Sequence, residues 1–320
     1  MLSPFPRLWL APMAGYTDTA MRALCHAMGA EATVSEMISA KAVVYRDKKT
    51  VALGRVTEEE GPVLLQLFGR EPSVMAEAAA MLADGYCGSR PVGIDINMGC
   101  PVPKIAGNGE GSALLRDPAL CHAIVHAVRA ALPKDLPLTV KLRLGWDRTS
   151  LTVREVAAAV VEGGVSAIFV HGRTRSEMYM GSADWETIAA VAASVPVPVI
   201  GNGDITGAEG ARERLRDSGC YGLMIGRGAV GNPFLFREVA AALRGEPIPP
   251  PADDGERRRT ALAHLAAACR DKGEHVAVRE ARKQIAAYIR GMKGAAAVRA
   301  AINAAVRYEE VAAILCSLEA

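Results

Sequence analysis

Short apolar runs alternate with alanine-rich stretches along most of this 320-residue chain, at a spacing of about 30 residues. Eight runs are candidate strands, and they are Leu8–Ala11, Thr33–Ser35, Val63–Leu67, Gly93–Asn97, Leu138–Leu142, Ala167–His171, Val197–Ile200 and Gly222–Ile225. The clearest helical stretches between them are 73–84, 117–131, 152–162, 184–194 and 207–217. Strands that alternate with helices in this way form right-handed βαβ units and a parallel sheet.

Eight such units favour a closed (β/α)8 barrel, the TIM barrel, over other α/β folds. A doubly wound open sheet is the alternative, but it would be favoured by a GxGxxG fingerprint after the first strand, which this chain lacks. We assign the barrel to residues 1–244 and a stiff proline-rich linker to 245–255. Residues 256–320 have helical periodicity throughout and predict a small all-helical domain.

The charge is uneven along the chain. The net charge is only +2, but residues 256–320 carry twelve Lys and Arg against seven Asp and Glu. This excess indicates an anionic partner for the helical part, although a solvated helix face would have the same composition. The N-terminus lacks the features of a signal peptide and no apolar run approaches a membrane span, so we expect a cytoplasmic protein with no membrane partner.

Metal chemistry is not indicated. The seven cysteines are scattered with no CxxC pair, and the chain has no HxH or HExxH motif. Zinc and iron–sulfur sites therefore lack their usual ligand spacing, and we expect no bound metal.

Polar residues follow the strands where a barrel places its active site, at the carboxyl ends. In chain order they are Pro12, Met13 and Ala14, Gln66, Asn97 and Cys100, Lys141 and Arg143, His171 and Arg173, Asn202, Gly203 and Asp204, and Gly226 and Arg227. The last two groups are glycine-rich and precede helices. They predict a phosphate site, since such sites often follow strands seven and eight, although glycine also serves tight turns.

Two of these residues carry the chemistry. Cys100 lies on a turn between Gly99 and Pro101, where a thiol is better placed to react than a core cysteine is. Lys141 alternates with apolar residues on its strand, so its ammonium points into the barrel mouth or extends out of it. In the mouth it could act as a Schiff-base nucleophile or as a fixed positive charge opposite a bound anion.

The motifs at the strand ends resemble those of the tRNA-dihydrouridine synthase family. They are Ala11–Gly15, Asn97–Pro101, Lys141–Arg143, His171–Thr174, Asn202–Ile205 and Gly226–Arg227, followed by the helical run Arg282–Gly291. The resemblance covers nearly the whole chain. Gly111–Leu115 and the basic helix near Arg282 are most similar to the bacterial B subgroup.

This resemblance implies a flavin enzyme that reduces D-loop uridines of tRNA to 5,6-dihydrouridine. FMN would lie in the mouth against Pro12, Met13 and Ala14. Gln66, Lys141 and His171 would contact its ring or polar edge, and Asn202, Gly203, Asp204, Gly226 and Arg227 its phosphate. Hydride would pass from flavin N5 to uracil C6, and Cys100 would protonate C5. Asn97 and Arg173 would contact the substrate, NADPH or NADH would reduce the flavin, and the enzyme would be a monomer.

One segment departs from the pattern of the family. The loop 102–110 after Cys100 contains Lys104 and Glu110 where a more basic stretch is expected, which bears on rate and substrate position. Three other functions stay open from the residues. These are a flavin barrel dehydrogenase or ene-reductase acting on a free small molecule such as a dihydropyrimidine, a lysine Schiff-base aldolase, and a non-enzymatic RNA-binding scaffold.

Overall fold

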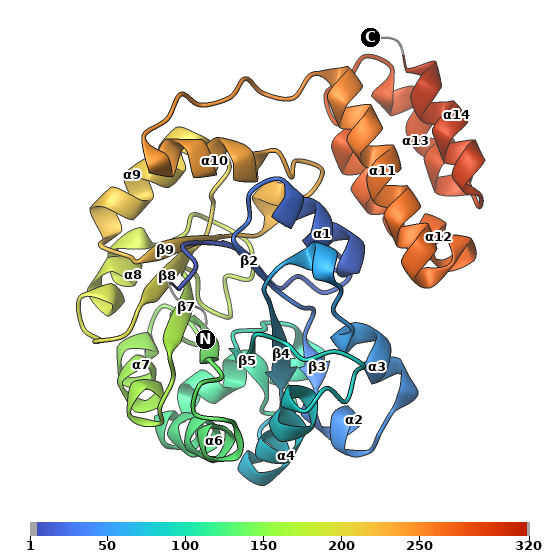
Figure 1. Ribbon diagram of the computed structural model, residues 1–320. Helices are drawn as coiled ribbons and strands as arrows, with labels where there is room; N and C mark the ends of the chain where they lie inside the picture. The colour runs from blue at the N-terminus through green and yellow to red at the C-terminus, as the bar shows by residue number, and fades with distance from the viewer. Residues whose placement is uncertain (1–4, 319–320) are drawn as a thin grey trace.

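The structure, a computed structural model, describes residues 5–318 and consists of a closed parallel barrel and a group of C-terminal helices (Figure 1). The strands are β1 (Leu8–Leu10), β2 (Ala32–Val34), β3 (Ile38–Ser39), β4 (Val63–Phe68), β5 (Gly93–Met98), β6 (Leu138–Arg143), β7 (Ala167–His171), β8 (Val199–Asn202) and β9 (Gly222–Ile225). They pair in the order β2-β1-β9-β8-β7-β6-β5-β4-β3, and β2 also pairs with β4. That additional pairing closes an eight-stranded barrel, so the predicted TIM barrel is confirmed.

Helices cover the barrel between successive strands. Those of the barrel are α1 (Thr19–Ala27), α2 (Ala40–Val44), α3 (Lys48–Gly54), α4 (Pro72–Ala83), α5 (Pro103–Ala106), α6 (Pro118–Ala131), α7 (Val153–Glu162), α8 (Trp185–Ala192), α9 (Ala208–Ser218) and α10 (Leu235–Arg244). Short 3-10 turns occur at η1 (Glu58–Glu60), η2 (Gly111–Arg116) and η3 (Arg227–Ala229). The C-terminal helices are α11 (Asp254–Lys272), α12 (Glu274–Tyr288), α13 (Ala295–Ala304) and α14 (Tyr308–Ser317).

Most elements lie within one or two residues of the ranges expected from the sequence. The α6 helix begins at Pro118, where the missing proline N–H costs little, and the Asp117 side chain accepts a hydrogen bond from Leu120 N at its N-cap. Two differences occur among the strands. β8 spans Val199–Asn202 rather than 197–200, and β3, a two-residue strand beside the end of β4, was not predicted. The predicted ranges also include residues 1–4 and 319–320, which lie outside the described part.

Much of the interior of the barrel is filled by apolar side chains. Trp9, Leu64, Phe169, Ile200 and Met224 belong to one buried cluster inside the barrel. The rings of Trp9 and Phe169 meet nearly edge-on at 5.0 Å, an arrangement that aromatic pairs favour. This filled interior leaves the carboxyl end of the strands as the place where polar side chains gather.

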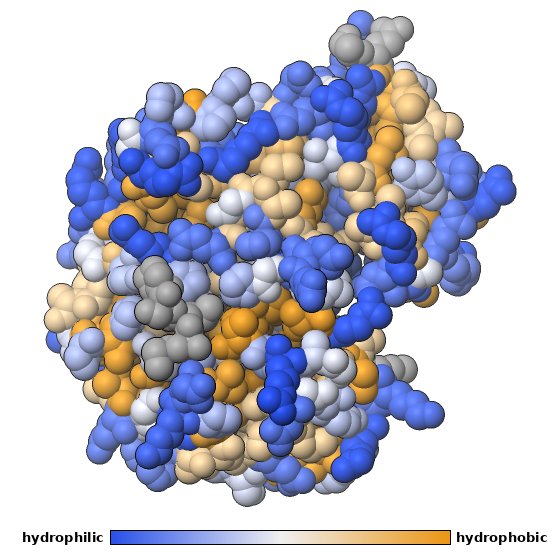
Figure 2. Space-filling view, in the orientation of Figure 1, coloured by the Kyte–Doolittle hydropathy of each residue, from blue (hydrophilic) through white to orange (hydrophobic). Residues whose placement is uncertain are grey.

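The C-terminal helices form their own core and lie beside α1 (Figure 1). Residues 245–253, between α10 and α11, are neither helix nor strand. Small residues at the junction, Ala20, Ala268 and Ala277, are buried together, which allows the two parts to approach closely. Strongly hydrophilic residues stand out on the outer side of this helical group in Figure 2. Within residues 5–318, no helix has both the length and the apolar character needed to cross a bilayer.

Candidate active site

The Cys100 turn is held by hydrogen bonds from three sides. Asn97 Oδ1 accepts from Gly99 N (3.2 Å) and Cys100 N (2.9 Å). The Cys100 carbonyl oxygen accepts from Ser112 N (3.1 Å) and Ser112 Oγ (2.8 Å). Arg143 Nε donates to the carbonyl of Gly99 (2.9 Å). The backbone of Cys100 is therefore held at the carboxyl end of β5.

The Cys100 thiol is mostly protonated at neutral pH. Burial raises its pKa above the usual value, although a hydrogen bond with the Val102 backbone and the charges of Arg143 and Lys141 oppose this effect. A thiol in this state can donate a proton, whereas nucleophilic cysteines are activated by a lowered pKa.

A chain of buried polar side chains runs from the Cys100 turn into the barrel. Asn97 Nδ2 donates to Gln66 Oε1 (2.8 Å), and Gln66 Nε2 donates to Asp95 Oδ2 (2.7 Å). Thr139 Oγ1 donates to the other Asp95 oxygen (2.6 Å). Burial raises the pKa of Asp95 to about 6, against the opposing effects of these two hydrogen bonds and Lys141. Gln66, predicted at a cofactor edge, is fully buried and holds Asn97 and Asp95 together.

Lys141 joins three strands at the mouth. Its Nζ donates to Asn202 Oδ1 (3.2 Å), and Asn202 Nδ2 donates to the Met224 carbonyl on β9 (2.7 Å). Burial and the nearby Arg143 lower the lysine pKa to about 8, while Asp95 and Cys100 act in the opposite direction. Lys141 is therefore a partly destabilised cation, and a bound anion would favour its charged form.

His171 is buried next to these cations at the end of β7. Burial first, and then the charges of Lys141, Arg143, Arg173 and Arg227, lower its pKa well below the usual range. The imidazole is therefore neutral at physiological pH. Arg173 Nη1 lies 3.4 Å from its Nε2, which is consistent with Nε2 accepting the hydrogen bond.

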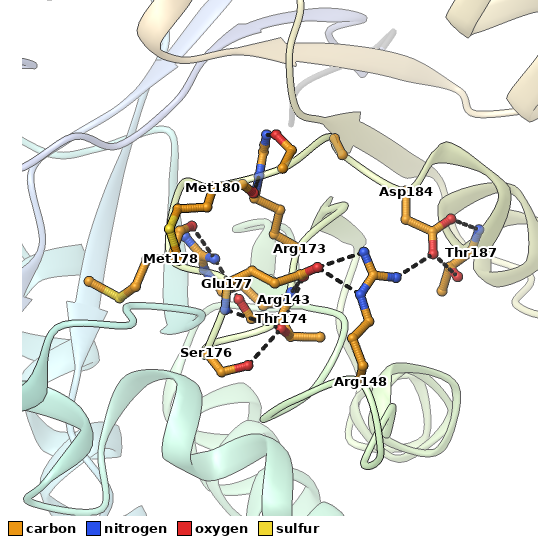
Figure 3. A network of polar contacts seen from close by, with 12 residues as sticks. Arg143, Arg148, Arg173, Thr174, Ser176, Glu177, Met178, Met180, Asp184 and Thr187 are labelled. Atoms are coloured by element: carbon orange, nitrogen blue, oxygen red, sulfur yellow. Dashed lines mark hydrogen bonds and ion pairs between the residues drawn. The ribbon is translucent and has the colours of Figure 1, made fainter.

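Arg173 and Asp204, predicted as a substrate contact and a phosphate contact, bind each other. Arg173 Nη1 and Nη2 donate to the two Asp204 oxygens at 3.0 and 2.8 Å, a forked pairing. Arg173 also donates to the carbonyls of Met180 (2.9 Å) and Gly181 (2.6 Å) and is almost fully buried (Figure 3). Its guanidinium is thus engaged within the protein. Arg227 Nη2 makes a weaker, exposed contact with the same carboxylate at 3.3 Å.

Of Gly203 and Gly226, the glycines at the last two strand ends, Gly203 is the one that has no space for a side chain. Gly203 has a positive φ of 139°, and a Cβ there would lie 2.5 Å from Ala183 Cβ. A Cβ on Gly226 would be 3.6 Å from Ala11 Cβ and from Met13 Sδ. The structure therefore brings the Pro12–Ala14 turn after β1 next to the Gly226 turn after β9, as barrel closure requires.

Arg143 was predicted to lie at the mouth but was given no role, and Asp95 and Tyr179 were not predicted as site residues. Arg143 Nη1 donates to the carbonyls of Thr174 (2.8 Å) and Met178 (2.7 Å), so it ties the loop after β7 to the Cys100 turn (Figure 3). Tyr179, at the exposed tip of this loop, has Arg227 and Arg143 over its ring at 5.0 and 5.5 Å. Arg143 was visible in the strand-end pattern. Nothing in the sequence indicated Tyr179.

The C-terminal helices reach the rim of the mouth next to the turn after β1. Gln284 Nε2 donates to the Tyr16 carbonyl (3.1 Å), and Lys283 Nζ lies 4.1 Å from the centre of the Tyr16 ring. Lys272 Nζ donates to Asp18 Oδ2 (2.7 Å) at the N-cap of α1. A basic helix face is therefore anchored beside the active-site opening.

Comparison with known proteins identifies the family of this chain. A model of the family described as dihydrouridine synthase (Dus) matches residues 9–319. The chain belongs to the dihydrouridine synthase family. The family expected from the motifs is thereby confirmed, and the protein is an enzyme.

The relatives within the dihydrouridine synthase family align over most of their length. tRNA-dihydrouridine synthase B of Pseudomonas putida is 44% identical over 299 residues, which are 93% of this chain and 86% of that protein. A probable tRNA-dihydrouridine synthase of Rhodobacter capsulatus is 42% identical over 88% of this chain and 86% of its own length. The solved structure of histamine dehydrogenase from Rhizobium sp. 4-9 has a TM-score of 0.56 at 12% identity, covering 81% of this chain and 48% of that one. That likeness shows the barrel fold alone.

Proposed function

We propose that this protein reduces D-loop uridines of tRNA to 5,6-dihydrouridine, using FMN as bound cofactor and NADPH or NADH as reductant. The observation that carries the proposal is the protonated Cys100 thiol, fixed at a mouth that also presents Lys141. The names of the relatives, tRNA-dihydrouridine synthase B among them, supply the substrate class.

The residues at the mouth fit a flavin mononucleotide. Cationic side chains gather there, with Lys141 and Arg143 partly destabilised by burial, and an anionic group would relieve that cost. The backbone at Gly226 carries no side chain, and the nearest atoms to a Cβ there would be Ala11 Cβ and Met13 Sδ at 3.6 Å, so this turn can lie close to a phosphate. Pro12, Met13 and Ala14 would contact the ring, with Asn202, Asp204 and Arg227 around the phosphate. Reduced FMN supplies a hydride when it is bound.

Cys100 and Lys141 have separate roles in this proposal. Reduction of the uracil C5=C6 bond requires a hydride at C6 and a proton at C5, and the Cys100 thiol donates that proton. Lys141 would provide a fixed positive charge beside the ring of a bound flavin. His171, neutral and buried, can bind a polar edge by a hydrogen bond and contributes no charge.

Asn97 and Arg173 were both predicted to contact the substrate, and both bind other groups of the protein. Asn97 Oδ1 accepts both turn amides and its Nδ2 donates to Gln66, so its first role is to position Cys100. Its Nδ2 also makes a weak contact with Met37 Sδ (3.9 Å), which a uracil oxygen would replace. Arg173 acts on the site by holding Asp204 and the loop after β7.

The substrate proposal also rests on the basic helices beside the mouth. The target uridine in folded tRNA must leave its stack to reach Cys100, at a cost of a few kcal/mol. Lys283 and the other cations of the helical part can recover this cost through phosphate contacts, which makes binding salt-dependent.

Mass spectrometry of tRNA tests the proposal. Purified protein should be yellow and, with NADPH, should add two mass units to a D-loop uridine of unmodified tRNA. We expect Cys100→Ala to retain flavin and tRNA affinity and to lose product by at least about 100-fold, the lower end of general-acid contributions. Cys316→Ala, a change at an exposed cysteine, is the matched control. Protein that takes up no FMN, or that reduces a free pyrimidine and leaves tRNA unchanged, would overturn the proposal.

A further inference from the structure

A hollow of about 600 Å³ lies on the rim of the barrel beyond the Cys100 turn. Three segments that follow β4, β5 and β6 form it, with Arg70 from the first, Ala106–Asp117 from the second and Trp146 from the third. Its size is within the range of small-molecule sites, about 300–1,000 Å³. None of the roles described above uses this hollow.

The hollow combines positive charge with an aromatic platform. Arg116 lies over the Trp146 ring at 5.1 Å and Arg175 over it at 4.6 Å. Arg70, Arg116 and Arg175 make no ion pair with the described residues, and the buried Nε of Arg175 has no hydrogen-bond partner there. Two acids share the rim, Glu110 near Arg70 and Asp117, which caps α6. Arg70 and Arg116 line the hollow without an ion-pair partner among the described residues, and guanidinium planes offer stacking surfaces for a base.

One short 3-10 turn connects this hollow to the Cys100 turn. Ser112, at the start of η2, binds the Cys100 carbonyl, and Arg116, at its end, lines the hollow. At about 2 Å of rise per residue, these two positions are separated by roughly 8 Å along the axis. A strand of RNA that delivers a base to Cys100 from this side would pass the hollow.

We propose that this hollow binds a nucleotide of the RNA substrate next to the extruded uridine, with its phosphate at Arg70 and Arg116 and its base stacked on the layer of Arg116, Trp146 and Arg175. This inference rests on the proposed function and adds a second RNA contact to it. It also accounts for the weakly basic loop 102–110, because arginines from neighbouring segments supply the charge that the loop lacks.

The position of the hollow favours an RNA strand over a dinucleotide. The C-terminal helices lie beside α1, whereas α4 and α6 lie away from them, at the bottom of Figure 1. A tRNA held by the helical part on one side would gain a second, cationic contact on the other. Two separated contacts fix the direction of the strand across the mouth, which a single basic surface does not.

Titration of full-length protein with unmodified tRNA at several salt concentrations tests the hollow. Replacing both rim arginines, Arg70→Gln with Arg116→Gln, should weaken binding about tenfold or more and reduce the log–log salt slope by about 0.7, the contribution of one single-strand phosphate contact. Trp146→Leu should weaken binding about 5- to 100-fold, the range of one lost base stack, with the slope unchanged. Arg214→Gln is the matched control, since Arg214 lies over Trp185 on the outside of the barrel at 5.1 Å.

The outcomes separate this inference from the proposed function. Wild-type protein that binds no tRNA would overturn the proposed function and the inference with it. Wild-type binding that the rim variants and Trp146→Leu leave intact would overturn the inference alone. A raised KM for NADPH with intact tRNA affinity would assign the hollow to the dinucleotide and also overturn it.

Discussion

Asp95 is the residue whose burial has the clearest energetic consequence. It lies fully inside the barrel, where an ionised carboxylate is costly even with two hydrogen bonds. Its raised pKa means that the folded protein binds this proton more tightly than the unfolded chain does. Asp95 therefore stabilises the fold most at low pH, and this contribution is lost as the pH rises through about 6.

We expect Asp95→Asn to gain stability relative to the wild type as the pH rises from 4 to 8. Because folding raises the pKa of Asp95 from 3.8 to about 6, the full difference is about 3 kcal/mol. Denaturant unfolding of both proteins across this range measures the difference directly. A constant difference between the two proteins would mean that Asp95 titrates normally. Asp147→Asn, on the surface, serves as the control.

At the same scale, sequence patterns placed the site residues at the mouth but could not assign their partners. Strand periodicity orients Lys141 and Asn97, because side-chain direction alternates along a strand. The pairing of Arg173 with Asp204 depends on how two loops 31 residues apart meet, which no local pattern encodes. The position of Tyr179 likewise depends on the path of a loop that Arg143 holds.

The loop after β7, residues 172–184, is the element whose order depends most on buried charge. Arg143 and Arg173, both labelled in Figure 3, bind four of its carbonyls. Asp204 accepts from Ala183 N at 2.7 Å. The site therefore includes a loop that is fixed by arginines in place of an apolar core of its own. Such a loop is sensitive to the geometry of the guanidinium group as well as to its charge.

We expect Arg173→Lys to destabilise the protein by about 2–4 kcal/mol and to make residues 174–183 exchange amide hydrogens faster. Lysine keeps the charge but cannot make the forked pair with Asp204 or reach both carbonyls. Hydrogen exchange with mass spectrometry locates the effect. Arg148→Lys is the matched control in this loop, since Arg148 is half-exposed and its ion pairs with Glu177 and Asp184 should contribute less than about 1 kcal/mol. Equal protection in Arg173→Lys and wild type would contradict this account.

Elements with strong periodicity were predictable, and the exceptions have local causes. β3 has two residues, too few for any alternation of apolar and polar side chains to be recognised. β8 begins two residues late because Pro198 cannot donate to a sheet, and the strand continues instead through Gly201 to Asn202. The closure of the barrel between β2 and β4 follows from the number of units and was expected from that number.

At the scale of the whole molecule, the ion pair between Asp18 and Lys272 joins the barrel to the C-terminal helices. Burial tends to raise the pKa of Asp18, but the charge and hydrogen bond of Lys272 outweigh burial and lower it. Asp18 also caps α1, and Lys272 binds Glu280 on α12. One lysine thus links the barrel to two helices of the RNA-binding surface that we propose.

We expect a double-mutant cycle of Asp18→Asn and Lys272→Met to give a coupling of about 1–2 kcal/mol at pH 7, since both side chains are largely buried and asparagine still caps the helix. Because the folded pKa of Asp18 is lowered, this stabilisation is present above its unfolded value of 3.8 and is lost as the pH falls through the folded pKa. The exposed pair Arg244 and Glu246 should couple much more weakly in the same assay. Lys272→Met should also lower the yield of dihydrouridine while flavin content stays constant, because the basic helices lose their fixed position beside the mouth. Full yield in that variant would show that the junction stabilises the fold without directing the RNA.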